Sequence, residues 1–198
     1  MAVLLFNRWD FAGVEVRDAG LKKYMNLRPV VVPKTSGRYG TVSIHKAKMN
    51  IVERFITKLF VPGHRGKKHK LTSGQVVGGY QRVFNAMNDA FDIIEKRTKK
   101  NPIQILVTAI ENGALYEEVM GYRLGGVIAR KAVVVAPQRR LDVSLRLIAQ
   151  DIFSRSFHSK KTFPETVADE LIELASNDQR NNVIRERQRI EKEAESAR

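Results

Sequence analysis

Residues 101–140 decide the fold and read NPIQILVTAIENGALYEEVMGYRLGGVIARKAVVVAPQRR. Asn101 suits the N-cap of a helix, and Pro102 suits its first position, where the missing N–H is not needed. Apolar residues then recur at helical spacing until Gly113, which predicts a short helix. The helical spacing ends at this glycine, so a different structure must follow.

A β-hairpin is predicted for residues 115–135. The run from Val127 to Val135 is dominated by β-branched residues, and Gly125-Gly126 separates two candidate strands. An isolated hairpin is only marginally stable in water, so a ribbon that projects from a helical body usually has something to touch. Pro137 then opens the next helix, because proline is favoured at a helix start.

Helical periodicity dominates the chain from Ser43 onward. The first helix should place Ile44 on its buried stripe and Arg54 on its outer face. Further helices are predicted from about Gly74 to Thr98, from Pro137, from the capping box Thr162–Glu165, and from Asn181. The last of these is polar nearly all round, which is typical of a helix that lies on a partner or is held by its own charge pairs.

The sequence predicts two regions, a partly extended N-terminal arm at 1–42 and a helical domain at 43–198 that carries the hairpin. The arm holds short apolar runs and a turn-rich stretch at 33–40, which argue against regular structure. Burial of Phe6, Trp9 and Phe11 should anchor its first part.

Positive charge is the unusual property of this chain of 198 residues. It holds 35 Lys and Arg against 21 Asp and Glu, a net charge of +14. Residues 21–100 hold 18 basic and 4 acidic side chains, so this segment alone accounts for a net +14. A local excess favours a polyanionic partner whose counterions are released on binding. Arg and Lys mixed with Gly, Tyr and His in loops favour RNA as that partner.

Phosphate binding is the expected role of the basic side chains on the first helix and in the loop after it. They are Lys46, Lys48, Arg54, Arg65, Lys67, Lys68 and Lys70. His69, in the same loop, should face RNA or be exposed. Arg82, Lys96 and Arg97 share their helix with acidic residues, so a solvated face or intrahelical pairs explain them equally well.

No constellation in the sequence supports an enzyme, a metal site or a cofactor. The absence of cysteine excludes disulfides, a cysteine-based zinc finger and a thiol nucleophile. Glu117 and Glu118 are neighbours on a strand, so they point to opposite faces and cannot act together as acid and base. No apolar run approaches the roughly 20 residues that span a bilayer, so we expect a protein that stays inside the cell, away from membranes.

Two short motifs favour a different binding module. Residues 37–40 and 63–66 both fit the Gly-x-x-Gly motif of KH domains, which clamps a nucleic-acid backbone. A KH domain joins two helices tightly by that loop, whereas residues 67–73 still separate the second motif from the next predicted helix. A free-standing KH-like or helix-turn-helix regulator of nucleic acid remains the alternative hypothesis.

Five blocks of sequence resemble the universal small-subunit ribosomal protein seven family. They occur in the family's order between residue 21 and the end: Asn50–Arg54, Asn101–Gln104, Gly125-Gly126, Pro137–Arg140 and Ala168–Ile172. The arm and the Ser-Ala-Arg end are similar to the archaeal and eukaryotic branch. The chain departs from the family pattern at Leu115–Glu118, which lacks a proline and a basic residue, and at Ala136, where serine is usual.

The resemblance implies a mainly α fold, a bundle of about six helices with a protruding two-stranded hairpin and an extended arm. It implies a cytoplasmic, non-enzymatic constituent of the small ribosomal subunit, without cofactors, that binds small-subunit ribosomal RNA in the head and nucleates head assembly. The hairpin would lie near the exit-site transfer RNA and the messenger path, beside the universal small-subunit protein eleven. The protein would act as a monomer within the ribosome.

The resemblance also implies which residues meet RNA. Ribosomal RNA contacts would come from Lys46, Lys48, Arg54, Arg65, Lys67, Lys68, His69, Lys70, Gln138, Arg139, Arg140 and Arg146. The ribbon would present Tyr122, Arg123, Arg130 and Lys131 toward transfer RNA.

Overall fold

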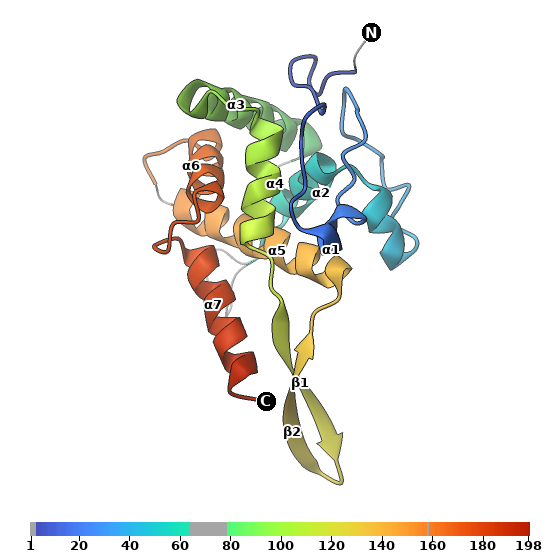
Figure 1. Ribbon diagram of the computed structural model, residues 1–198. Helices are drawn as coiled ribbons and strands as arrows, with labels where there is room; N and C mark the ends of the chain where they lie inside the picture. Colours follow the sequence, from blue (N-terminus) through green and yellow to red (C-terminus); the bar gives the residue numbers. More distant parts are fainter. Residues whose placement is uncertain (1–2, 64–78, 158) are drawn as a thin grey trace.

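The structure is a computed structural model that describes residues 3–63, 79–157 and 159–198. Its elements are α1 (Ala19–Lys22), the 3-10 helix η1 (Ser43–Lys48), α2 (Ile51–Phe60), α3 (Tyr80–Thr98), α4 (Pro102–Asn112), β1 (Glu117–Leu124), β2 (Val127–Val134), α5 (Pro137–Ser156), α6 (Phe163–Ala175) and α7 (Asn182–Glu195). Within these described ranges, six helices have ten or more residues. The predicted mainly α fold with one two-stranded ribbon is confirmed (Figure 1).

The helices form one bundle in which α5 contacts α2, α4, α6 and α7 (Figure 1). Each of these helices contributes an apolar stripe at helical spacing to a single core. Phe55, Phe91, Ile110, Leu145 and Leu171 are fully buried there and come from five different helices. The core therefore fixes α2 and α5 side by side, which matters for the basic residues on their outer faces.

Polar side chains define where most of these helices begin. Asn50, Asn101 and Asn181 each accept a hydrogen bond from the backbone N–H two residues ahead, at 2.9, 3.0 and 2.8 Å. Each bond satisfies one of the free N–H groups of a first helical turn. The predicted capping box of Thr162 and Glu165 is also present at the start of α6.

Asn101 joins the cap of α4 to the arm, because its Nδ2 also donates to the carbonyl of Asp10 at 2.7 Å. Asn101→Ala removes both bonds and is expected to lower the free energy of unfolding by about 1–2 kcal/mol, measured by urea denaturation. Asn85→Ala is the matched control, since its one side-chain bond, to Gln81, is exposed. An equal loss in both variants would contradict the role of Asn101.

The first predicted helix is interrupted, and the expected burial of Ile44 was wrong. Residues 43–48 form η1, and the backbone is extended at Met49 and Asn50 before α2 begins. Asn50 causes the break, because it caps α2 and donates from Nδ2 to the carbonyl of Arg28 at 2.8 Å. Ile44 is consequently 62% exposed. Part of the second predicted helix, residues 74–78, lies outside the described residues.

The arm lies along α3 and α4 (Figure 1). The predicted burial of Trp9 and Phe11 is confirmed, and the Trp9 ring meets that of Phe91 edge-on at 5.4 Å. Trp9 also donates from Nε1 to Glu95 at 3.0 Å. Further along, Glu111 accepts two backbone N–H groups of the arm. Side chains of α3 and α4 thus accept hydrogen bonds from the arm at both places.

The ribbon projects from one end of the bundle, and α7 packs along its base (Figure 1). Gly125 and Gly126 have φ values of 53° and 93° and close the two-residue turn, where a hairpin favours positive φ at both positions. Arg198, just beyond α7, forms an ion pair with Glu117 at 2.6 Å. The predicted polar helix is therefore held partly by contact with the ribbon.

Candidate nucleic-acid interface

Four basic side chains gather near Asp142 of α5. Lys46 comes from η1, Arg54 and Lys58 from α2, and Arg146 from α5; together we call them the α2–α5 basic cluster. Arg54 Nη2 lies 3.0 Å from one Asp142 oxygen, and Lys46 Nζ lies 4.0 Å from the other. The cluster therefore holds four cations and one carboxylate, and this excess of positive charge favours the binding of a further anion.

Arg54 is the buried member of this cluster. The sequence prediction that it lies on the outer face was wrong, because only 3% of the residue is exposed. Its Nη2 is paired with Asp142, but Nε and Nη1 are buried without a hydrogen-bond partner among the described residues. Buried donors without acceptors are costly, so Arg54 adds positive charge to the cluster from beneath its surface at a cost to stability.

Lys58 completes the cluster and was not predicted as a site residue. Burial lowers its pKa, and the nearby charges of Lys46, Arg146 and Arg54 lower it further, while Asp142 acts in the opposite direction. The folded protein therefore holds an ammonium group where its charge is disfavoured. The available sequence signal was its spacing of four residues from Arg54, which places both on one side of α2.

Five predicted residues of the basic loop lie outside the described residues: Arg65, Lys67, Lys68, His69 and Lys70. Gly63, the last described residue before them, lies beside Gln150 on α5. Gln150 follows Arg146 by one helical turn. Nearer the start of α5, the side-chain amide of Gln138 is buried without a partner among the described residues.

Arg139 and Arg140, both predicted to contact RNA, differ in their exposure. Arg139 has a side chain that is 56% exposed and is paired with Glu118, one of its contacts being 2.8 Å. Arg140 is buried and donates to the Leu115 carbonyl and to Asp18, both at 2.7 Å. Of the two guanidinium groups, only that of Arg139 is accessible to RNA.

The four predicted ribbon residues divide between two faces. Residues that lie opposite each other in an antiparallel pair of strands share a face of the ribbon. The opposed pairs are Met120 with Lys131, Gly121 with Arg130, Tyr122 with Ala129, and Arg123 with Ile128. Tyr122 and Lys131 therefore lie on one face, with Arg123 and Arg130 on the other. Arg130 also lines a cavity with Glu193 of α7. One flat RNA cannot contact all four side chains.

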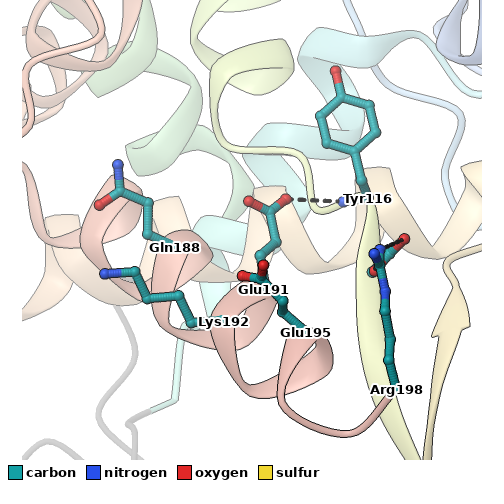
Figure 2. Close-up of a pocket in the computed structure, with 7 residues that line it drawn as sticks. Tyr116, Gln188, Glu191, Lys192, Glu195 and Arg198 are labelled. Carbon is teal, nitrogen blue, oxygen red and sulfur yellow. Dashed lines mark hydrogen bonds and ion pairs between the residues drawn. The ribbon is translucent and has the colours of Figure 1, made fainter.

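A groove of about 560 Å³ lies between α7 and β1 (Figure 2). Its lining is Tyr116, Glu117, Gln188, Glu191, Lys192, Glu195 and Arg198. Arg198 is paired with Glu117, and Glu191 accepts the backbone N–H of Tyr116 at 3.1 Å. Three carboxylates against two cations make this groove unsuited to phosphate.

The described residues offer neither a metal site nor a membrane span. Within the described ranges, no group of three or more His, Asp or Glu side chains is placed to hold a metal ion. No helix there is long and apolar enough to cross a membrane. The α2–α5 basic cluster thus remains the strongest candidate site in this part of the chain.

Comparison with known proteins agrees with this architecture. The family model for ribosomal protein S7p/S5e matches residues 21–198. The small ribosomal subunit protein uS7 of Nanoarchaeum equitans is 40% identical over the full length of both chains, and that of Methanococcus aeolicus is 39% identical, also over full length. The protein of the same name from Archaeoglobus fulgidus is 38% identical over 99% of this chain and 95% of its own. The chain therefore belongs to the ribosomal protein S7p/S5e family.

Proposed function

We propose that this protein binds small-subunit ribosomal RNA in the head domain and helps to nucleate head assembly. Its family makes it a structural, non-enzymatic constituent of the small ribosomal subunit, in the cytoplasm. RNA binding and a role in translation follow from the same membership. The head domain as the binding site and the role in nucleation are our proposal.

The observation that carries the proposal is the α2–α5 basic cluster. Arg54 has two buried donors without acceptors, and Lys58 is held where its own charge is disfavoured. The charge on Lys58 is unfavourable in the free protein, and a phosphate group that enters the cluster would favour it. Lys46, Lys48, Arg146 and Arg139 would extend the contact over the exposed surface.

The hairpin supports a second contact with RNA. Tyr122 and Met120 are 39% and 50% exposed, and Lys131 lies on the same face. An aromatic ring with a neighbouring ammonium group suits unpaired bases and their phosphates. We propose that this face approaches the exit-site transfer RNA and the messenger path, with the universal small-subunit protein eleven as a neighbour.

A free-standing KH-like or helix-turn-helix regulator is the alternative, and the described residues give it little support. The Gly37–Gly40 stretch forms a turn before η1 and does not join two long helices. The second Gly-x-x-Gly stretch extends beyond the described residues. The regulator hypothesis predicts self-association and selectivity for a short sequence, whereas a ribosomal protein should bind one folded RNA junction as a monomer.

Filter binding tests the proposal directly. The purified chain is titrated with a transcript of the head domain and with an unrelated structured RNA over a salt series. Tight binding to the head transcript alone, retained at physiological salt, is the expected result. Equal and steeply salt-sensitive binding to both RNAs would indicate non-specific electrostatic binding and would overturn the proposal.

Lys58→Met should affect RNA binding and stability in opposite directions. Losing one phosphate contact is expected to weaken binding to the head transcript about fivefold near 150 mM salt and to lower the salt slope by about one. The free protein should be as stable as the wild type or slightly more so, because the disfavoured charge is removed. Lys96→Met, on the exposed face of α3, is the matched control. A variant that binds like wild type would exclude Lys58 from the site.

A further inference from the structure

A smaller cavity of about 260 Å³ lies between the arm and the junction of η1 with α2. Its wall comprises Asn26, Arg28, Pro29, Val30, Val32, Pro33, Lys34, Thr35, Tyr39, Lys48, Asn50 and Glu53. The volume lies just below the roughly 300–1,000 Å³ of pockets for drug-sized molecules, so it suits a single planar ring system. The cavity is separate from the α2–α5 basic cluster, since the two share no residue.

Glu53 gives the cavity a buried acceptor. Only 4% of the residue is exposed, and its Oε1 accepts the backbone N–H and the hydroxyl of Thr35 at 2.6 and 2.7 Å. Its Oε2 is buried without a hydrogen-bond partner in the described part of the chain. Buried polar atoms are nearly always satisfied, so an orphan carboxylate oxygen in a cavity wall indicates a ligand that donates hydrogen bonds.

Hydrogen bonds hold the wall around Glu53 together. Asn50 is 5% exposed; it accepts the N–H of Val52 and donates to the carbonyl of Arg28. Asn26 donates to the carbonyl of Lys48 and accepts the N–H of Arg28. These bonds join the arm to the start of α2, so a ligand would enter a preformed site.

Basic and aromatic side chains complete the cavity. Arg28 and Lys48 are exposed, and neither forms an ion pair within the described ranges. Lys34 lies over the Tyr80 ring at 5.0 Å. Tyr39, in the turn before η1, lines the wall and can offer a ring for stacking. The site therefore combines one buried acceptor, free cationic donors and an aromatic ring.

We propose that this cavity binds a single unpaired guanine of the RNA partner, an inference that rests on the proposed RNA-binding function. Guanine alone among the four bases presents two adjacent donors, N1–H and N2–H, on its Watson–Crick edge, and these would share Oε2 of Glu53, since Oε1 already accepts two hydrogen bonds from Thr35. Its O6 and N7 accept hydrogen bonds from Arg or Lys, the commonest specific contact to guanine, and Arg28 and Lys48 supply them. On the other bases a ring nitrogen or carbonyl acceptor would face the carboxylate.

The test uses the full chain and four fluorescein-labelled pentaribonucleotides, UUGUU, UUAUU, UUCUU and UUUUU, measured by fluorescence anisotropy at low salt. Wild-type protein is expected to bind UUGUU about tenfold more tightly than the other three, a discrimination typical of one well-formed base contact. Equal binding of all four oligonucleotides would overturn the inference.

Glu53→Gln is the decisive variant, because it keeps the shape while replacing one acceptor oxygen by a donor. It should lose the preference for UUGUU and keep its affinity for UUUUU. Asp89→Asn, on the exposed face of α3, removes the same charge elsewhere and should keep the preference. Thermal unfolding establishes that each variant folds. If Glu53→Gln does not fold, Lys48→Met serves as the test variant. It should show a weaker preference for UUGUU, and an unchanged preference would also overturn the inference.

Failure of this inference is distinguishable from failure of the proposed function. Lys58→Met should weaken binding of all four oligonucleotides to a similar extent and leave the guanine preference unchanged. If the head transcript is bound selectively but the oligonucleotides bind equally, the proposed function stands and the guanine site is rejected. If neither RNA preference is found, both are rejected.

Discussion

Arg140→Met is expected to lower the free energy of unfolding by about 3 kcal/mol. Arg140 is buried, and it joins α5 to two segments that are distant in sequence. Its Nε donates to the Leu115 carbonyl, its Nη2 pairs with Asp18 of the arm, and its guanidinium lies 4.4 Å from the Tyr116 ring centre. Methionine preserves the aliphatic packing but leaves the Leu115 carbonyl without its donor and Asp18 without its cation.

The adjacent Arg139 provides the control, since its guanidinium is exposed and pairs with Glu118. Exposed pairs contribute about 1 kcal/mol or less, so Arg139→Met should leave unfolding in urea nearly unchanged. Under the proposed function it should instead weaken binding to the head transcript. Equal destabilisation by both substitutions would contradict the structural role assigned to Arg140.

Because Arg140→Met removes the partner of Asp18, the stability lost in this variant should depend on pH. Hydrogen bonds from Arg140 and from the backbone lower the pKa of Asp18, against the opposing effect of burial, which is the largest single influence. Its contribution to stability is thus present above the ordinary pKa of an aspartate and is lost in acid. The difference between wild type and Arg140→Met should accordingly shrink below about pH 4.

Stability is expected to fall by on the order of 2 kcal/mol between pH 6 and pH 9, and Glu170→Gln should remove most of that fall. Glu170 is fully buried between α5, α6 and the start of α7. Burial raises its pKa to about 8, the negative charge of Asp151 raises it as well, and Arg155 and Asn181 act in the opposite direction. At neutral pH the carboxyl is therefore mainly protonated.

The direction of the effect follows from this raised pKa. The folded protein holds a proton on Glu170 that the unfolded chain releases near pH 4.5, so stability is greatest below that value. It declines as the pH rises toward 8, where the folded protein also loses the proton and a second buried negative charge faces Asp151. Glutamine resembles the protonated acid, since it can accept from Asn181, as Glu170 does at 3.0 Å, and donate to Asp151.

Thermal unfolding at a series of pH values measures this effect as the difference between wild type and variant. Groups distant from Glu170 titrate in the same way in both proteins, so the difference reports on Glu170 and its buried neighbours. Glu173→Gln is the matched control, because its side chain is 39% exposed and also contacts Arg155. Parallel curves for wild type and Glu170→Gln would show that Glu170 does not control alkaline stability.

The sequence by itself determined the elements whose signals are local. Asn101-Pro102 and Thr162–Glu165 mark helix starts because a side chain there bonds to the next turn of its own helix. Gly125-Gly126 marks the hairpin because a two-residue turn favours positive φ at both positions. The blocks that resemble the ribosomal family were also readable from residue types and order alone, and so was the concentration of positive charge.

Only the tertiary structure decided what each basic residue does. Arg139 and Arg140 are neighbours in sequence, yet one is exposed and the other buried, because Asp18 reaches Arg140 from 122 residues away. Arg54 is buried for a similar reason, since its partner Asp142 is 88 residues distant. Helical periodicity predicts the burial of a residue from its own hydrophobicity and its position in the repeat. The burial of a charged side chain depends instead on a counter-charge and on packing supplied by distant segments, which only the folded chain brings together.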